Sequence, residues 1–312
     1  MILLRLITTV AALAATVTAG VTRGLIISLD NETAMDVDTT TLGNLNLYEQ
    51  YSAAAYCFAN DIATPGTPIR CAAGNCPLVE TNLATVSFSF LDVGKGGVSG
   101  FVAADNTNRI LVLAFRGIRS VETGITTLDT RLVDTSLCGA TVGCQVNEGF
   151  QDSWDSVSAR ITREIANAQA ATTFTTLVVT GHGVGGALAT LAATLYRTTP
   201  PVAAVTTIDL YTYGSPRVGN AIFATFVTTG NDAINFRATH TDDPIPKFPS
   251  RALGYLQWGP EYWIRAPTGQ AVHTTDITKL SGTETPFGNG GTPPIFDIPA
   301  HLWYFNEVAK CI

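Results

Sequence analysis

The residues best placed to do chemistry lie in residues 177–188, which read LVVTGHGVGGAL. An apolar run typical of a buried strand enters a turn of small residues, and a helical pattern leaves it. This is the context of a nucleophile elbow, the G-x-S-x-G turn that holds a serine hydroxyl above the end of a sheet. The outer glycines are present as Gly181 and Gly185, but the centre is Gly183. The turn therefore lacks the hydroxyl that nucleophilic catalysis needs.

Two further side chains could serve the same chemistry. A histidine must take the proton from the attacking group, and a carboxylate must hold the correct imidazole tautomer. Asp243 and His301 follow position 183 in the order acid, then base. On the residues alone, Asp242 and Asp243 before Pro244 are more typical of a solvated turn, and His301 of a loop histidine.

Short β-rich runs alternate with helical stretches around these residues. Strands are predicted at 85–91, 100–104, 110–115, 176–180, 208–213 and 234–238, and helices at 147–171, 187–196 and 221–227. Such alternation favours an α/β fold with a mostly parallel sheet covered by helices on both faces. Residues 281–299 are rich in Gly, Pro and Thr and are predicted to be loop. Because no repeat or linker divides the chain, we expect a single domain.

The composition excludes some classes of protein. Apolar residues make up 46% of the 312 residues and charged residues 14%, so the chain can bury a large core and is not mainly disordered. The formal net charge is −7. Without a basic surplus, nucleic acid is not expected as a partner.

The N-terminus is typical of a secretory signal. One Arg precedes an apolar run over residues 6–19 that ends in small side chains, so we expect cleavage after Ala19. A membrane anchor is the alternative, but this run is shorter than the roughly 20 residues that a span needs, and no later stretch is long and apolar enough. We assign residues 1–19 to the signal, 20–45 to a lead-in segment or propeptide, and 46–312 to the folded domain. Asn31 lies in a glycosylation sequon, in agreement with an extracellular protein.

The cysteines favour the same compartment. Six are present, at positions 57, 71, 76, 138, 144 and 311. The close spacings suit local bonds within 71/76 and 138/144 and leave 57 and 311 to join the ends, although sequence alone allows 15 pairings. A zinc site is not favoured, because no C-x2-C pair occurs and the four histidines do not have ligand spacing. We expect no metal and no cofactor.

Several motifs resemble the fungal class 3 lipases and their feruloyl-esterase relatives. The elbow of that family reads GHSLGGALA, against GHGVGGALA at residues 181–189. Collinear segments that also resemble the family are 51–57 (YSAAAYC), 105–108 (DNTN), 115–117 (FRG), 213–220 (YGSPRVGN), 260–264 (PEYWI) and 298–304 (IPAHLWY). The resemblance implies an α/β-hydrolase fold with a short surface lid. It also implies the disulfides Cys57–Cys311, Cys71–Cys76 and Cys138–Cys144.

The resemblance carries site roles onto matching positions. It places the nucleophile position at Gly183, the orienting acid at Asp243 in residues 239–243 (THTDD), and the general base at His301. The backbone N–H groups of Ile118 and Val184 would form the oxyanion hole, although the family usually has Ser or Thr at position 118.

The lid departs from the family as well. It corresponds to residues 120–127 (SVETGITT), where Gly124 stands in place of the usual tryptophan.

The resemblance implies a secreted hydrolase of triacylglycerols and other carboxylic esters, active in lipid metabolism. Gly183 and Ile118 predict instead a catalytically inactive or severely impaired pseudoenzyme. Such a protein would bind a lipid or ester in the acyl cleft, or contact a lipid interface or another macromolecule through its lid. The alternatives are an active lipase or esterase that uses another nucleophile, and a Ser-to-Gly laboratory variant of one. Ser215 and Thr180 are not expected to lie within reach of His301.

Overall fold

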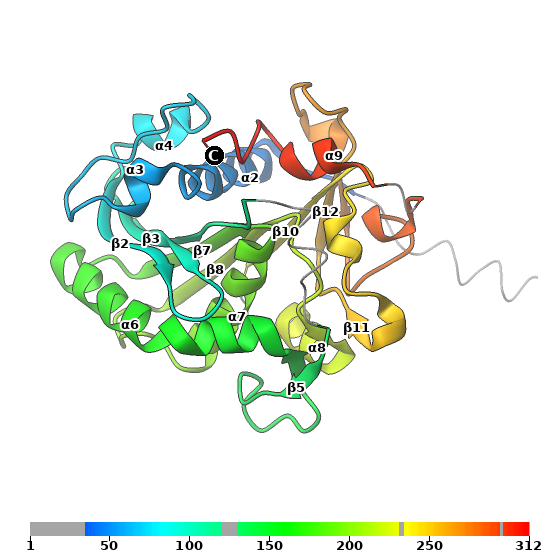
Figure 1. Ribbon diagram of the computed structural model, residues 1–312. Helices are drawn as coiled ribbons and strands as arrows, with labels where there is room; N and C mark the ends of the chain where they lie inside the picture. The colour runs from blue at the N-terminus through cyan, green and yellow to red at the C-terminus, as the bar shows by residue number, and fades with distance from the viewer. Residues whose placement is uncertain (1–34, 120–129, 231–233, 294–295, 312) are drawn as a thin grey trace, which may run out of the picture. The chain divides into compact units, whose positions relative to one another are not determined.

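The computed structural model describes residues 35–119, 130–230, 234–293 and 296–311 (Figure 1). The compact unit that carries the features below begins at Asp36, and its first helix starts ahead of the boundary predicted at residue 45. The signal segment, the sequon at Asn31 and the lid position Gly124 lie outside the described residues.

Strands and helices alternate along most of the chain, as the sequence predicts. The strands are β1 (Met35–Asp36), β2 (Thr85–Val93), β3 (Val98–Asp105), β4 (Ile110–Phe115), β5 (Leu132–Asp134), β6 (Gln145–Asn147), β7 (Thr176–His182), β8 (Thr207–Tyr213), β9 (Gly219–Asn220), β10 (Asn235–His240), β11 (Tyr255–Leu256), β12 (Glu261–Ile264) and β13 (Ile277–Leu280). The α-helices are α2 (Thr39–Ala54), α3 (Phe58–Asp61), α4 (Pro77–Thr81), α6 (Glu148–Thr172), α7 (Val184–Thr198), α8 (Ala221–Thr229) and α9 (Ile298–Leu302). Short 3₁₀ turns lie at Ile245–Lys247, Arg251–Leu253, Thr274–Asp276 and Asn289–Gly291.

The main sheet runs in the order β13-β12-β10-β8-β7-β4-β3-β2. Its centre is parallel, since β12, β10, β8, β7 and β4 pair in parallel. The pairs β12–β13, β2–β3 and β3–β4 are antiparallel and form its two sides. A small second sheet joins β11, β9, β6 and β5. The predicted mostly parallel sheet is confirmed.

Helices cover both faces of the sheet (Figure 1). Because successive side chains of a strand point to opposite faces, each central strand contributes to the core on both sides. On β4, the side chains of Leu111, Leu113 and Phe115 belong to the core that α6 and α7 cover. Those of Val112 and Ala114 belong to the core on the opposite face, against α2. Both faces of β4 are thus fully buried, which explains its continuous apolar sequence.

Polar side chains cap the first turns of α6 and α8. The side chain of Asn147 accepts a hydrogen bond from the backbone N–H of Phe150 at 3.0 Å and starts α6. The side chain of Asn220 does the same for Phe223 at the start of α8. Each bond satisfies one of the donors that a first helical turn leaves unpaired. Among the helices of the described ranges, none combines the length and apolarity that crossing a membrane requires.

Three disulfides hold the unit together. They join Cys57 to Cys311, Cys71 to Cys76 and Cys138 to Cys144, the pairs that the resemblance implies. The first spans a sequence separation of 254 residues and ties the C-terminal segment to the start of α3. In the chain-entropy view, closing so long a loop destabilises the unfolded chain by about 5 kcal/mol.

The core between α6 and α7 generates the first prediction. The indole of Trp154 on α6 is 1% exposed and packs edge-on against Phe115 and Tyr196, at centroid distances of 6.1 and 5.9 Å. We expect Trp154→Ala to lower the free energy of unfolding by about 3–5 kcal/mol, because it leaves a cavity, as measured by urea denaturation.

Val142→Ala, at a side chain 91% exposed, is the matched control and should change stability by less than about 0.5 kcal/mol. A loss below about 1 kcal/mol for Trp154→Ala would contradict this account of the core.

Candidate active site

The elbow depends on a close approach of two backbones. A Cβ on Gly181 would lie 2.3 Å from the carbonyl oxygen of Gly185, and one on Gly185 would lie 2.4 Å from the carbonyl oxygen of Phe115. Real Cβ contacts are never this short, so side chains at either position would push β7, α7 and the loop after β4 apart. The two outer glycines of the motif therefore fix how α7 leaves the sheet.

Gly183 lies between β7 and α7, in a backbone conformation that strains other residues. Its φ is +57° and its ψ is −127°, a combination that only glycine adopts freely. A Cβ built there would lie 3.2 Å from Nε2 of His301 and 3.5 Å from Cε1. Any side chain at position 183 would thus point at the imidazole.

His301 and Asp243 are in direct contact, although 58 residues separate them in the chain. Nδ1 of His301, on α9, lies 2.9 Å from Oδ2 and 3.1 Å from Oδ1 of Asp243. Because the carboxylate only accepts, Nδ1 donates the proton, and in the neutral ring Nε2 carries a lone pair directed toward position 183. The structure thus brings together three of the residues that the sequence singled out.

The carboxylate of Asp243 is fully buried and hydrogen-bonded on several sides. Besides His301, it accepts from the hydroxyl of Tyr304 at 2.7 Å and from the backbone N–H of Ile245 at 2.8 Å. A Cβ on Gly214, at the end of β8, would approach Asp243, His301 and Tyr304 to 2.8 Å each. Glycine at 214 is what lets these three groups meet.

The predicted oxyanion-hole residues lie against the elbow. A Cβ on Gly117 would lie 2.6 Å from the carbonyl oxygen of His182, so the loop after β4 packs on the turn. Ile118 follows and is 39% exposed. Val184 is the first residue of α7, and the N–H groups of a first helical turn have no intrahelical acceptor. Their role as oxyanion-hole donors stays a prediction.

A buried chain of hydrogen bonds links Tyr56 and His182 to the backbone of His301, and the sequence did not predict it. Nε2 of His182 lies 2.8 Å from the carbonyl oxygen of His301, and its Nδ1 lies 2.7 Å from the hydroxyl of Tyr56. A carbonyl only accepts, so Nε2 carries the proton and the hydroxyl of Tyr56 donates to Nδ1. Burial lowers the pKa of His182 well below its usual range, and the nearby His301 lowers it further. His182 is therefore a neutral spacer that fixes the backbone of His301. The sequence feature that could have indicated this role is His182 itself, the histidine between the two glycines of the elbow.

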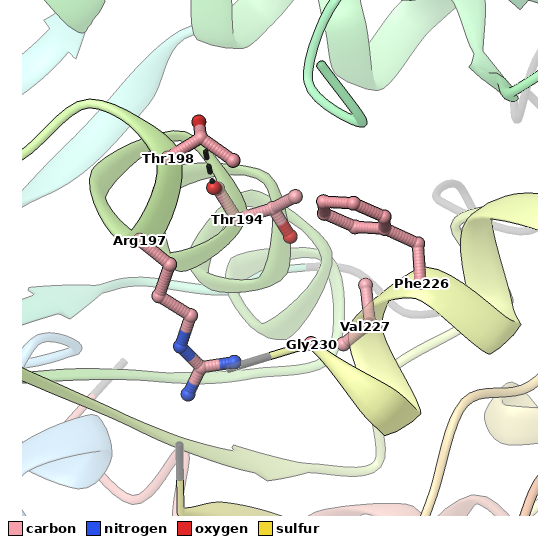
Figure 2. Close-up of a pocket in the computed structure, with 6 residues that line it drawn as sticks. All are labelled: Thr194, Arg197, Thr198, Phe226, Val227 and Gly230. Atoms are coloured by element: carbon pink, nitrogen blue, oxygen red, sulfur yellow. Dashed lines mark hydrogen bonds between the residues drawn. The ribbon is translucent and has the colours of Figure 1, made fainter. Parts of the chain in front are cut away.

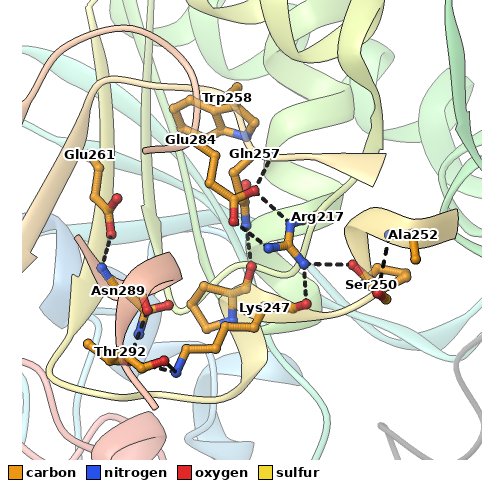
Figure 3. Close-up of polar contacts among 12 residues, drawn as sticks. Arg217, Lys247, Ser250, Ala252, Gln257, Trp258, Glu261, Glu284, Asn289 and Thr292 are labelled. Atoms are coloured by element: carbon orange, nitrogen blue, oxygen red, sulfur yellow. Dashed lines mark hydrogen bonds and ion pairs between the residues drawn. The ribbon is translucent and has the colours of Figure 1, made fainter. Parts of the chain in front are cut away.

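A buried ion pair and a buried amide support the loop that follows β10 and carries Asp243. Figure 3 shows the ion pair, Arg217 with Glu284, and the amide of Asn289. The guanidinium of Arg217 binds both carboxylate oxygens of Glu284 and the carbonyl oxygen of Pro249. The side chain of Asn289 donates to the carbonyl oxygen of Asp243 at 2.9 Å, and its backbone N–H donates to Glu261 at 3.1 Å. These contacts hold the acid from beneath.

A small cavity between α7 and α8 lies elsewhere (Figure 2). Its volume is about 10 Å³, and Thr194, Arg197, Thr198, Phe226, Val227 and Gly230 line it. Such a space holds about one water molecule and no acyl chain. It is not the expected lipid cleft.

One group of potential metal ligands occurs in the part of the chain that the structure describes. The sulfur atoms of Cys57, Cys71 and Cys311 lie within 4.8 Å of one another. All three are oxidised in disulfides and so cannot act as thiolate ligands.

Comparisons with known proteins agree on one group. Residues 112–253 match the family described as "Lipase (class 3)", and residues 7–88 match the "Lipase 3 N-terminal region". The chain is 42% identical over 277 residues to "Secreted mono- and diacylglycerol lipase A" of Penicillium cyclopium, covering 88% of this chain and 87% of that one. It is 39% identical to "Secreted mono- and diacylglycerol lipase 1" of Fusarium solani, over 89% and 80% of the two chains. The crystal structure of mono- and diacylglycerol lipase from Aspergillus oryzae superposes with a TM-score of 0.80 at 37% identity, over 88% of this chain and all of that one.

The neutral state of His182 generates a pH prediction. The unfolded histidine has a pKa near 6.5 and the folded one is lowered, so the unfolded chain binds the extra proton as the pH falls below about 6.5. This histidine therefore stabilises the fold above that pH and loses its contribution below it. Between about pH 6 and about pH 5, wild-type stability should fall more steeply than that of His182→Gln, by up to about 1.4 kcal/mol per pH unit.

Urea unfolding at each pH measures the difference, and the glutamine retains an N–H donor for the carbonyl of His301. Parallel pH profiles for wild type and variant would show that His182 is not held neutral.

Proposed function

Because this chain belongs to the class 3 lipase family and has the α/β-hydrolase fold, we propose that it is a secreted ester-binding protein that has lost efficient hydrolysis. It descends from a serine ester hydrolase and retains the acid and the base. At Gly183 it lacks the nucleophilic serine that the family has there. The protein is catalytically inactive or severely impaired.

The observation that carries this proposal is the geometry at Gly183. A Cβ at this position would point at Nε2 of His301 from 3.2 Å, which is where a general base must meet the group it deprotonates. Glycine offers no hydroxyl to deprotonate. Loss of the nucleophile from such a triad typically costs on the order of 10⁶ in turnover.

Neighbouring hydroxyls do not supply a substitute among the described residues. Ser215 is fully buried and donates to the carbonyl oxygen of Pro216. Thr180 donates to the carbonyl oxygen of Tyr48 and is also fully buried. Tyr304 donates to Asp243 on the Nδ1 side of His301, away from Nε2. These contacts support the loss of function.

Ile118 is a second change in the same direction. The family usually supplies a Ser or Thr hydroxyl at this position to the developing oxyanion. An isoleucine side chain can donate no hydrogen bond, and losing one such donor costs roughly 10²–10³ in turnover. Backbone N–H groups of Ile118 and Val184 would still polarise a bound ester carbonyl.

The ligand we propose is an acylglycerol or a related carboxylic ester. The relatives at 42% and 39% identity are named mono- and diacylglycerol lipases. A partial glycerol ester has the carbonyl that these backbone donors can bind and the acyl chain that a lipase cleft buries. The lid would add contacts to a lipid interface.

We place the protein outside the cell. The expected signal over residues 1–19 and the three disulfides are typical of exported proteins. The same relatives are named as secreted.

Ester hydrolysis should depend on whether position 183 holds glycine, serine or alanine. Wild type should hydrolyse p-nitrophenyl butyrate no faster than His301→Ala, within a factor of about ten. Gly183→Ser should restore weak turnover because the hydroxyl would meet His301, and adding Ile118→Ser should raise turnover by a further factor of about 10². Gly183→Ala is the matched control and should stay inactive.

The free energy of unfolding separates the effect of the new hydroxyl from the effect of adding a Cβ at position 183. Gly183→Ser and Gly183→Ala should both lose about 1–3 kcal/mol of stability, because each places a Cβ at a strained φ of +57°. Wild-type turnover that disappears in His301→Ala, or labelling of any wild-type serine by a fluorophosphonate, would overturn the proposed loss of activity.

Ligand binding is tested with an ester analogue that cannot be cleaved. We expect a short-chain dialkyl glycerol ether to bind wild type with a negative heat-capacity change, because binding buries apolar surface. Isothermal titration calorimetry measures this change. The ether lacks the carbonyl, so a dialkanoyl glycerol should bind more tightly to this inactive protein than the ether does. An ester-binding role would be refuted if neither compound gave a heat of binding and neither competed with the other.

A further inference from the structure

Two of the three disulfides lie side by side where the chain closes on itself. Sγ of Cys71 lies within 4.8 Å of the sulfur atoms of both Cys57 and Cys311, which are bonded to each other. Cys71 is itself bonded to Cys76, five residues along the chain. The C-terminal segment, red in Figure 1, ends here, where Cys311 is bonded to Cys57 at the start of α3.

The loop between Cys71 and Cys76 also grips the C-terminal segment. Asn75 is 3% exposed, and its Nδ2 donates to the carbonyl oxygens of Glu307 and Val308 at 3.1 and 3.2 Å. Its Oδ1 lies 3.5 Å from Sγ of Cys311. The two hydrogen bonds from Nδ2 hold residues 307 and 308 of the C-terminal segment against the Cys71–Cys76 loop.

A cavity borders three of the four cysteines, of which Cys57 is 4% and Cys71 5% exposed. It has a volume of about 660 Å³, and Cys57, Cys71 and Cys311 line it together with Arg70, Glu80 and Lys310. The carboxylate of Glu80 pairs with Arg70 at 3.9 Å and accepts from the backbone N–H of Cys71 at 2.8 Å. Cys76 does not line it and is fully buried. Cys71 is thus the cysteine of this bond on the cavity side, where a small dithiol would approach.

We propose that these two disulfides form a thiol–disulfide exchange site. An external dithiol attacks Sγ of Cys71, releases Cys76 as a thiol, and is itself oxidised to a cyclic disulfide as it leaves Cys71 as a thiolate. Sγ of Cys71 then attacks Sγ of Cys57, a Cys57–Cys71 bond forms, the Cys57–Cys311 bond breaks, and Cys311 leaves as a thiolate. The first step consumes the two electrons of one dithiol, and the second is electron-neutral.

The direction of the second step follows from where a thiolate is best accommodated. Solvent and neighbouring cations stabilise a thiolate, whereas apolar burial disfavours it. Cys311 is partly exposed and follows Lys310, whereas Cys57 is only 4% exposed. Cys311 is therefore the better leaving group of the two.

The exchange changes what the C-terminal segment is tied to. Before it, a bond across 254 residues anchors Cys311 to the start of α3. After it, only non-covalent contacts such as those of Asn75 hold the segment, which continues from α9 and the base His301. Reduction of the Cys71–Cys76 disulfide would thus release the covalent anchor of the segment that follows His301.

A pair of serine variants tests the proposal. In Cys76→Ser, the sulfur of Cys71 is free from the start. After incubation at pH 8 and alkylation with N-ethylmaleimide, non-reducing peptide mapping should find more than about a tenth of the molecules with a Cys57–Cys71 link and the label on Cys311. In the matched control Cys71→Ser, the label should stay on Cys76 with Cys57–Cys311 intact, because Cys76 lies outside the sulfur cluster.

A second measurement keeps the test decisive if Cys76→Ser does not fold. Wild type is titrated with substoichiometric dithiothreitol, quenched with N-ethylmaleimide and mapped, and a Cys57–Cys71 link should appear. The proposal is overturned if partly reduced molecules contain only native links, or if Cys71–Cys311 forms instead. It is equally overturned if folded Cys76→Ser keeps its label on Cys71 alone.

Discussion

The close contact between β7 and α7 is the constraint on which the rest of the site depends. Without Cβ atoms at Gly181 and Gly185, the strand, the helix and the carbonyl of Phe115 come within van der Waals distance of one another. The N–H of Gly183 then donates to the carbonyl oxygen of Tyr213 at 2.9 Å, which ties the turn to the end of β8. Gly214 follows Tyr213, and the side chains of Asp243 and His301 pack directly against it. One crossing of backbones thus sets the positions of the turn, the loop after β4 and the base.

The buried acid–base pair has a structural role that does not require catalysis. Asp243 is fully buried, and its carboxylate is stabilised by His301, Tyr304 and the N–H of Ile245. Removing any of these donors would leave part of a buried charge unsatisfied, which costs far more than a lost surface contact. Even without a nucleophile, replacing Asp243 or His301 alone would therefore destabilise the fold. Retention of Asp243 and His301 is compatible with a protein that binds esters without cleaving them.

The sequence predicted the central strands and the helices behind the elbow, because these follow simple periodicities. The predicted strand at 110–115 coincides with β4, and the helix predicted at 147–171 is displaced by one residue from α6. Helix α2 was missed, since its second half buries Glu49, Gln50 and Ser52 beside apolar residues, so no apolar stripe marks it. The strands β12 and β13 have only four residues each, too few for a pattern to emerge.

What the sequence determined by itself is chemistry that no packing can alter: glycine at 183 has no hydroxyl in any fold, and six cysteines form three pairs or fewer. Tertiary structure decided which groups meet. Of the buried histidines, His240 has both ring nitrogens on carbonyl oxygens and His182 supports the backbone, while only His301 faces position 183. Likewise, no spacing in the chain reveals that Cys71 lies beside the Cys57–Cys311 bond. The physical reason is that local pattern depends on near neighbours in the chain, whereas contacts between distant residues depend on how strand ends and helices pack across the sheet.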